Sequence, residues 1–132
     1  MPEVNWLAVV AAAVSSFVIG GLWYSPAMFL KAWQRGAGLT DAQLQSGHPG
    51  KIYGGALVLS LLAAAVFAMF IGPKPDVGFA TSAGFAAGLC WVAASFGINY
   101  LFERKCLALF LVNGGYHTVQ FTVFGLVLGL WH

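Results

Sequence analysis

The sequence predicts an all-α membrane protein with four transmembrane helices and a short amphipathic helix at the membrane interface. Of its 132 residues, 60% are hydrophobic and only 8% are charged, whereas about a quarter of the residues of a soluble domain are charged. Four apolar windows without acidic or basic side chains are long enough to cross about 30 Å of hydrocarbon as helices. These windows are residues 5–24, 52–71, 77–100 and 107–131. No linker interrupts them, so we predict one domain over residues 1–132.

The segment of residues 25–51 is the only sizeable one outside the apolar windows. After Pro26, apolar and polar side chains alternate at helical spacing, which predicts a short helix with Trp33 on its apolar face and Arg35 on its polar face, lying in the interface. Thr40 and Gln43 have the spacing of a capping box, which opens another short helix. We expect residues 46–50 to be a loop that leads into the second span.

The basic residues predict the orientation of the chain in the membrane. Five of the six lie in the segments 25–51 and 101–106, which are on the same side of the membrane. Only Lys74 lies on the opposite side. Lys and Arg concentrate on the cytoplasmic side of membrane proteins, so the loops at 25–51 and 101–106 are predicted to be cytoplasmic and both termini external. The apolar windows make the lipid bilayer the expected partner. The basic residues are few and lie beside the membrane, so we expect no binding of nucleic acid.

Small residues recur at four-residue spacing in every window. Such ladders let helix backbones approach closely, which is how membrane helices associate. Packing within one chain explains most of them, but four ladders exceed what one set of four helices needs, so we predict a homo-oligomer. The ladders are Ala8, Ala12, Ser16 and Gly20; Ala56, Ser60, Ala64, Ala68 and Gly72; Ala80, Gly84 and Gly88; and Gly125 and Gly129.

Polar side chains gather on one face of the last window. At about 100° per residue, Asn113, His117 and Gln120 fall within about 60° of one another, and His117 lies roughly 15 Å deep if the window spans the membrane. An imidazole at that depth is costly, so it indicates a working site. Other polar residues lie on the same side of the membrane and predict a pocket open to the cytoplasm. The predicted substrate-binding residues are Tyr24, Ser25, Asn99, Tyr100, Asn113, Tyr116, His117 and Gln120.

We predict no catalytic residues, no metal site and no cofactor. A zinc site needs three or four ligands, and the predicted topology keeps His48, His117 and His132 apart. Gly114 and Gly115 leave room beside His117, so its role as a porphyrin or chlorin ligand stays open. Proton coupling through a buried carboxylate is excluded, because all four acidic residues lie outside the windows. A coupling group would have to be His117, since imidazole has an unperturbed pKa of about 6.5.

Several motifs resemble those of a family of small bacterial four-span membrane proteins of unknown function. The first motif is NWLAV at residues 5–9, followed by GLWYSP at 21–26, NYLFER at 99–104 and the NxxYH element at 113–117. The resemblance covers nearly the whole chain and implies a bacterial inner (plasma) membrane location. It implies no activity, but it suggests a signature that matches the predicted pocket. The signature residues are Tyr24, Ser25, Asn99, Tyr100, Asn113 and His117.

Three functions compete on this sequence. The leading hypothesis is a homo-oligomeric channel or transporter for a small polar solute or ion, because a buried polar face occurs in a chain with little mass outside the membrane. The alternative is an accessory or assembly subunit of a larger membrane complex, in which His117 only bonds between helices. A membrane enzyme with His117 as general base is third, because no second catalytic group lies at a workable spacing.

Overall fold

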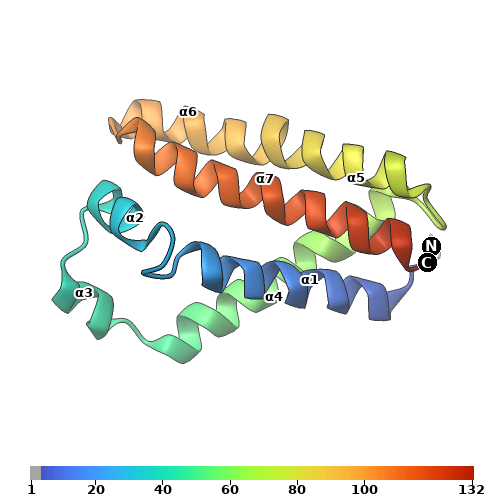
Figure 1. Cartoon of the computed structure of the whole chain (residues 1–132), viewed down its shortest axis with the longest axis horizontal. Helices are drawn as coiled ribbons and strands as arrows, with labels where there is room; N and C mark the ends of the chain where they lie inside the picture. Colours follow the sequence, from blue (N-terminus) through green and yellow to red (C-terminus); the bar gives the residue numbers. More distant parts are fainter. Residues whose placement is uncertain (1–3) are drawn as a thin grey trace.

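Helices make up the described structure, a computed structural model that covers residues 4–132. Residues 1–3, the start of the predicted domain, lie outside the described residues. Figure 1 shows the long helices running lengthwise, with α2 and α3 at one end, here called the loop end, and both termini at the other, the terminal end. The elements are α1 (Trp6–Trp23), α2 (Leu30–Ala37), α3 (Asp41–Ser46), α4 (Pro49–Ile71), α5 (Val77–Ala86), the π-helix η1 (Ala87–Ala93), α6 (Ala94–Glu103) and α7 (Leu107–Leu130). The prediction of an all-α chain is confirmed.

Three helical segments are long and apolar enough to cross a membrane. They are α1, α4 and the continuous run of α5, η1 and α6 over Val77–Glu103. Helix α7 has 24 residues but is not among them. It carries the polar face of Asn113, His117 and Gln120, and those side chains lower its hydropathy. The chain is therefore an apolar helical protein compatible with a bilayer, and its fourth span remains a prediction.

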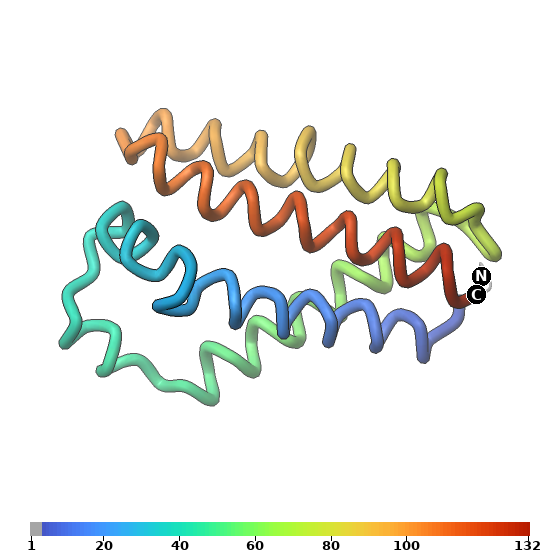
Figure 2. The backbone as a smooth tube through the Cα atoms, in the orientation of Figure 1, coloured from blue at the N-terminus to red at the C-terminus, as the bar shows by residue number. Residues whose placement is uncertain are grey.

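Helix α7 is the central helix of the structure. It packs against α1, α2, α5, η1 and α6 and also touches α4, and it lies between α1 and the α5–α6 run in Figure 2. A helix surrounded by protein does not need a continuous apolar surface, because its polar groups can bond to neighbouring helices instead of facing lipid. The position of α7 thus explains why this helix, despite its polar face, has more buried residues than any other long helical segment.

The small-residue ladders pack mainly within the chain. A Cβ atom added to Gly84 or Gly125 would collide with the carbonyl oxygen of Phe121 or Ala80, respectively, so the backbones of α5 and α7 are in contact. In α1 and α4, the residues Ala8, Ala12 and Ala64 are fully buried in the core. These contacts use most of the ladder surfaces that had suggested a homo-oligomer, which stays a prediction.

The core lies toward the terminal end. Apolar side chains of α1, α4, η1 and α7 meet there around Phe124, which is fully buried. Phe121 forms edge-to-face contacts with Phe67 and Phe124, with ring centroids 5.8 and 5.0 Å apart. Aromatic pairs in this geometry contribute about 0.5–1.5 kcal/mol beyond the area they bury. By contrast, residues 51–56 of α4, at the loop end, are all exposed.

The helix ends in the loop region follow local sequence signals. The capping box is confirmed, since the Thr40 hydroxyl accepts from the Gln43 amide and the Gln43 side chain accepts from the Thr40 amide. The prediction of a loop over residues 46–50 is wrong in part, because α4 begins at Pro49. Pro fits the first helical turn, where no N–H partner is needed, and His48 caps the helix by accepting from the Lys51 amide at 3.0 Å.

Candidate functional site

Three predicted site residues from three helical regions meet around Asn113 of α7. The Tyr24 hydroxyl, at the end of α1, donates to Asn113 Oδ1 at 2.6 Å. Asn113 Nδ2 in turn donates to the Tyr100 hydroxyl of α6, also at 2.6 Å. One amide thus uses its acceptor and one of its donors to join α1 and α6 through α7. We call this set the tyrosine–asparagine group (Tyr24, Tyr100 and Asn113).

Side chains of α1 and α7 surround this group and link the two helices. The Tyr116 hydroxyl donates to the Ser16 carbonyl at 3.0 Å, and the Trp23 indole donates to the Val112 carbonyl at 2.9 Å. The rings of Tyr24 and Trp33 make an edge contact at 5.8 Å, which brings α2 over the loop end of the group. Helix α2 is confirmed as a helix, and its place in a membrane interface remains a prediction.

A second hydrogen-bonded group lies one turn farther along α7. His117 Nδ1 and Gln120 Oε1 are 2.7 Å apart, and Gln120 Nε2 donates to the Ser60 hydroxyl of α4 at 3.4 Å. Gln120 and Ser60 are buried, with 5% and 7% of their surfaces exposed. We call this set the histidine–glutamine group (Ser60, His117 and Gln120). It connects α7 to α4, as the first group connects α7 to α1 and α6.

The hydrogen bond to Gln120 determines what the His117 ring can do. An amide oxygen only accepts, so Nδ1 carries the proton of this bond and Nε2 is an acceptor when the ring is neutral. The ring stacks on Phe96 of α6, with centroids 5.0 Å apart and planes 12° from parallel. Nε2 has no hydrogen-bond partner among residues 4–132, and no unpartnered side-chain nitrogen or oxygen there is buried. Nε2 therefore reaches the protein surface as an available acceptor.

Three of the eight predicted site residues lie outside both groups: Tyr116, which bonds to the Ser16 carbonyl, Ser25 and Asn99. The Ser25 hydroxyl donates to the Leu22 carbonyl at 2.6 Å, a local bond at the end of α1. Asn99 is exposed on α6, on a different face from its neighbour Tyr100. Whether any of the eight residues binds a substrate stays a prediction.

Ser60, Phe96 and Trp23 take part in the site, although sequence reasoning did not include them. Ser60 looked like one member of a small-residue ladder. Its hydroxyl in the middle of an apolar window was the available signal, because such a group needs a partner on another helix. Phe96 has no comparable signal, since an aromatic residue in a membrane helix is ordinary. Trp23 has the character of an interfacial residue, yet its indole bonds to α7.

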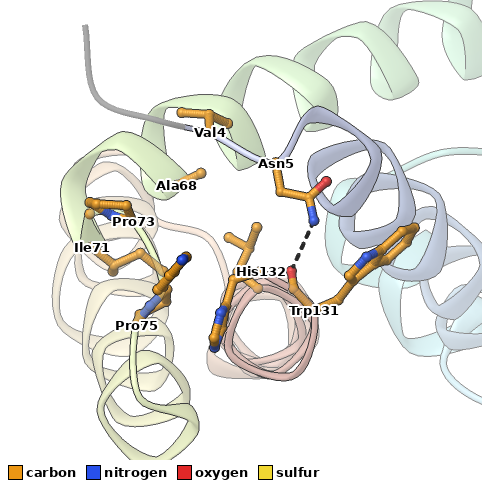
Figure 3. Close-up of a pocket in the computed structure, with 11 residues that line it drawn as sticks. Val4, Asn5, Ala68, Ile71, Pro73, Pro75, Trp131 and His132 are labelled. Atoms are coloured by element: carbon orange, nitrogen blue, oxygen red, sulfur yellow. Dashed lines mark hydrogen bonds between the residues drawn. The ribbon is translucent and has the colours of Figure 1, made fainter.

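The described residues also contain two hollows. A small cavity of about 30 Å³ lies at the terminal end, where Asn5 Nδ2 donates to the Trp131 carbonyl at 3.5 Å (Figure 3). A larger groove of about 510 Å³ lies between α4 and the α5–η1 run, with Phe121 of α7 also lining it. Its lining is apolar apart from the indole N–H of Trp91 and the thiol of Cys90, which is a free cysteine like Cys106.

Little in this geometry is arranged for metal chemistry. Within residues 4–132, no group of three or more His, Cys, Asp or Glu side chains is placed to hold a metal ion. The site instead offers neutral donors and acceptors, of which His117 Nε2 can accept a hydrogen bond or a proton.

Comparison with known proteins gives one match. A family model described as a protein of unknown function (DUF1761) matches residues 7–129. No curated protein matches the chain, and no solved structure matches it. The match includes both hydrogen-bonded groups and all the long helices almost to their ends. The chain therefore belongs to the DUF1761 family of proteins of unknown function.

Proposed function

We propose that this is a four-span protein of the bacterial inner membrane, with both termini external, that moves a small polar solute or ion as a homo-oligomer. The observation that carries the proposal is the stacking of two hydrogen-bonded polar groups along one face of the central helix α7. Polar side chains inside a membrane are costly and usually mark a substrate or ion pathway.

The two groups provide half of a pathway. In the predicted orientation the tyrosine–asparagine group faces the cytoplasm, and the histidine–glutamine group lies one turn deeper, near the middle of α7. Beyond it, the pathway meets the edge-to-face rings of Phe67, Phe121 and Phe124. These rings close the route toward the terminal end, so transport requires them to separate from one another.

The proton is the first ion to test. His117 is the only side chain within the apolar part of the four long helices whose ordinary pKa lies near neutral pH. Its Nε2 is a free acceptor, while Nδ1 is held by Gln120. A proton could therefore be taken up at Nε2 without breaking the hydrogen bond to Gln120.

Proton flux in proteoliposomes tests this function. The purified protein is reconstituted with a trapped pH-sensitive dye, and a potassium gradient with valinomycin drives protons inward. We expect His117→Phe, which keeps a ring stacked on Phe96, to reduce the flux to the level of empty liposomes. His132→Phe is the matched control, because His132 is exposed beyond the end of α7, and it should keep the wild-type rate. Equal rates for wild type and His117→Phe, or no wild-type flux of protons or of small polar solutes in swelling assays, would contradict the proposal.

The accessory-subunit hypothesis is the second candidate, and one observation is as compatible with it as with transport. No buried side-chain nitrogen or oxygen in residues 4–132 is left without a partner, which suits a scaffold as well as a resting transporter. Native mass spectrometry of protein gently extracted from its host membrane distinguishes the two. A stoichiometric partner chain supports the subunit, and a bare homo-oligomer supports transport.

A further inference from the structure

The groove between α4 and the α5–η1 run would open to lipid if these helices span a bilayer. Both walls come from helical segments that are apolar and long enough to span a membrane. Its volume of about 510 Å³ lies in the range of about 300–1,000 Å³ typical of small-molecule sites. The lining residues are Ala63, Val66, Phe67 and Phe70 of α4; Ala83, Ala86, Ala87, Cys90, Trp91 and Val92 of α5 and η1; and Phe121 of α7. A groove with this lining and position takes an apolar chain from the bilayer.

His117 does not line the groove itself, but helical spacing places it one turn from the residues that do. Phe121 lines the groove, and His117 lies four residues before it, on the same face of α7 one turn toward the loop end. Ser60, the partner of Gln120, likewise precedes the groove residue Ala63 by about one turn of α4. The histidine–glutamine group therefore continues the groove. His117 Nε2 reaches the surface there with no hydrogen-bond partner among the described residues.

We propose that this groove binds a membrane-soluble alcohol or phenol, whose apolar chain occupies the groove and whose hydroxyl donates to His117 Nε2. The tautomer explains the preference for a donor, because the proton on Nδ1 is engaged by Gln120 and only a lone pair is left at Nε2. A ligand hydroxyl that arrives from the hydrocarbon of the bilayer has no water to bond to, so it gains the bond to Nε2 without losing one to solvent.

A partner helix fits the same space less well. The backbone N–H groups of a membrane helix are already bonded within that helix, so its main chain cannot donate to His117. A helix is also about 10 Å across with its side chains, whereas a single hydrocarbon chain is narrow enough to lie between α4 and α5. This inference goes beyond transport and does not depend on it, since it concerns binding from the bilayer.

Trp91 in the groove wall serves as the reporter in a binding experiment. The protein is reconstituted in lipid nanodiscs and titrated with a dodecyl alcohol that carries a terminal bromine, or with the methyl ether of the same compound. Bromine quenches indole fluorescence on contact, and the difference between wild type and Trp91→Phe isolates the signal of Trp91. We expect saturable quenching, with the alcohol binding about fivefold more tightly than the ether, because one hydrogen bond contributes about 1 kcal/mol.

Two variants separate the polar end from the apolar groove. His117→Phe should abolish the preference for the alcohol while keeping the binding of both probes. Ala86→Phe should fill the groove and weaken both probes. Leu89→Phe should change neither, because Leu89, in the adjoining η1, is exposed and does not line the groove.

Three results would overturn the proposal. The first is equal affinity of the wild-type protein for the alcohol and the ether. This comparison does not depend on whether any variant folds. The second is a preference for the alcohol that survives in His117→Phe. The third is a stoichiometric second chain that covers Trp91 and removes the saturable quenching, which native mass spectrometry of the same sample would detect.

Discussion

The two ends of the molecule hold their helices together in different ways. At the terminal end, α5 and α7 touch through their backbones, with Gly125 against the Ala80 carbonyl and Gly129 against Val77. At the loop end, side-chain hydrogen bonds connect the helices: Tyr24 donates to Asn113, and Asn113 donates to Tyr100. The same central helix takes part in both.

The two kinds of contact differ in how far the helices at each end can rearrange. Backbone contact leaves no space for a new atom, so the terminal end has a single arrangement. Hydrogen bonds between side chains can exchange partners without moving a backbone, and α4 leaves residues 51–56 exposed at that end. We therefore expect rearrangements that serve function to occur at the loop end, while the terminal end stays fixed.

The largest expected effect tests the backbone contact. Gly125→Leu should lower the free energy of unfolding by about 3 kcal/mol or more, because its side chain would need the space of the Ala80 carbonyl. Gly55→Leu is the control, since a Cβ atom there meets no atom within 4 Å, and it should stay within about 0.5 kcal/mol of wild type. Unfolding in detergent micelles, followed by circular dichroism, measures both. Similar stabilities for the two variants would remove the distinction between the ends.

An intermediate effect tests the hydrogen bonds of the loop end. Asn113→Leu should cost about 1–2 kcal/mol, because it removes two side-chain bonds that average about 0.6 kcal/mol in membrane helices and leaves two hydroxyls to find other partners. Asn99→Leu makes the same replacement at an exposed position and should cost little. The same unfolding titration applies. A loss in Asn113→Leu as large as that of Gly125→Leu would show that the loop end is as constrained as the terminal end.

The smallest effect concerns the bond between α4 and α7. Ser60→Ala should lower the stability by about 0.5 kcal/mol, because the Gln120–Ser60 distance of 3.4 Å is at the weak limit of a hydrogen bond. Ser82→Ala, at an exposed position of α5, is the control and should be neutral. A cost above about 2 kcal/mol would mean that this contact, and not the apolar core, fixes α4 in place.

Much of the fold followed from local patterns, and the rest depended on tertiary contacts. Continuous apolar windows predicted the long helices to within a few residues, and Thr40 with Gln43 predicted its cap, because both signals are local. The start of α4 at Pro49 was missed, since proline and glycine suggest a loop unless a cap such as His48 is recognised. The use of the ladder residues within one chain could not be seen, because spacing shows that backbones can approach but not which helix approaches.

The candidate site shows the same limit. The polar face of α7 could be predicted from spacing alone, and the structure places two of its predicted neighbours from other helices, Tyr24 and Tyr100, in contact with Asn113. Whether Ser60 faces α7 depends on how α4 is rotated about its axis, and the exposure of Asn99 depends in the same way on α6. The composition of a helix that is apolar on nearly every face does not determine this rotation.

The π-helix η1 gives the α5–α6 run the effect of one extra residue. A π-turn adds a residue to a helical turn, which rotates everything after it by about 100° relative to a regular α-helix. One continuous rod can thus present Gly84 to α7 before the turn and Phe96 and Tyr100 after it. A protein of this kind that lost a single residue between Ala87 and Ala93 could keep all four apolar windows and the same hydropathy. It would nonetheless turn Phe96 away from His117 and Tyr100 away from Asn113, so in this family the length of that stretch should matter more than its composition.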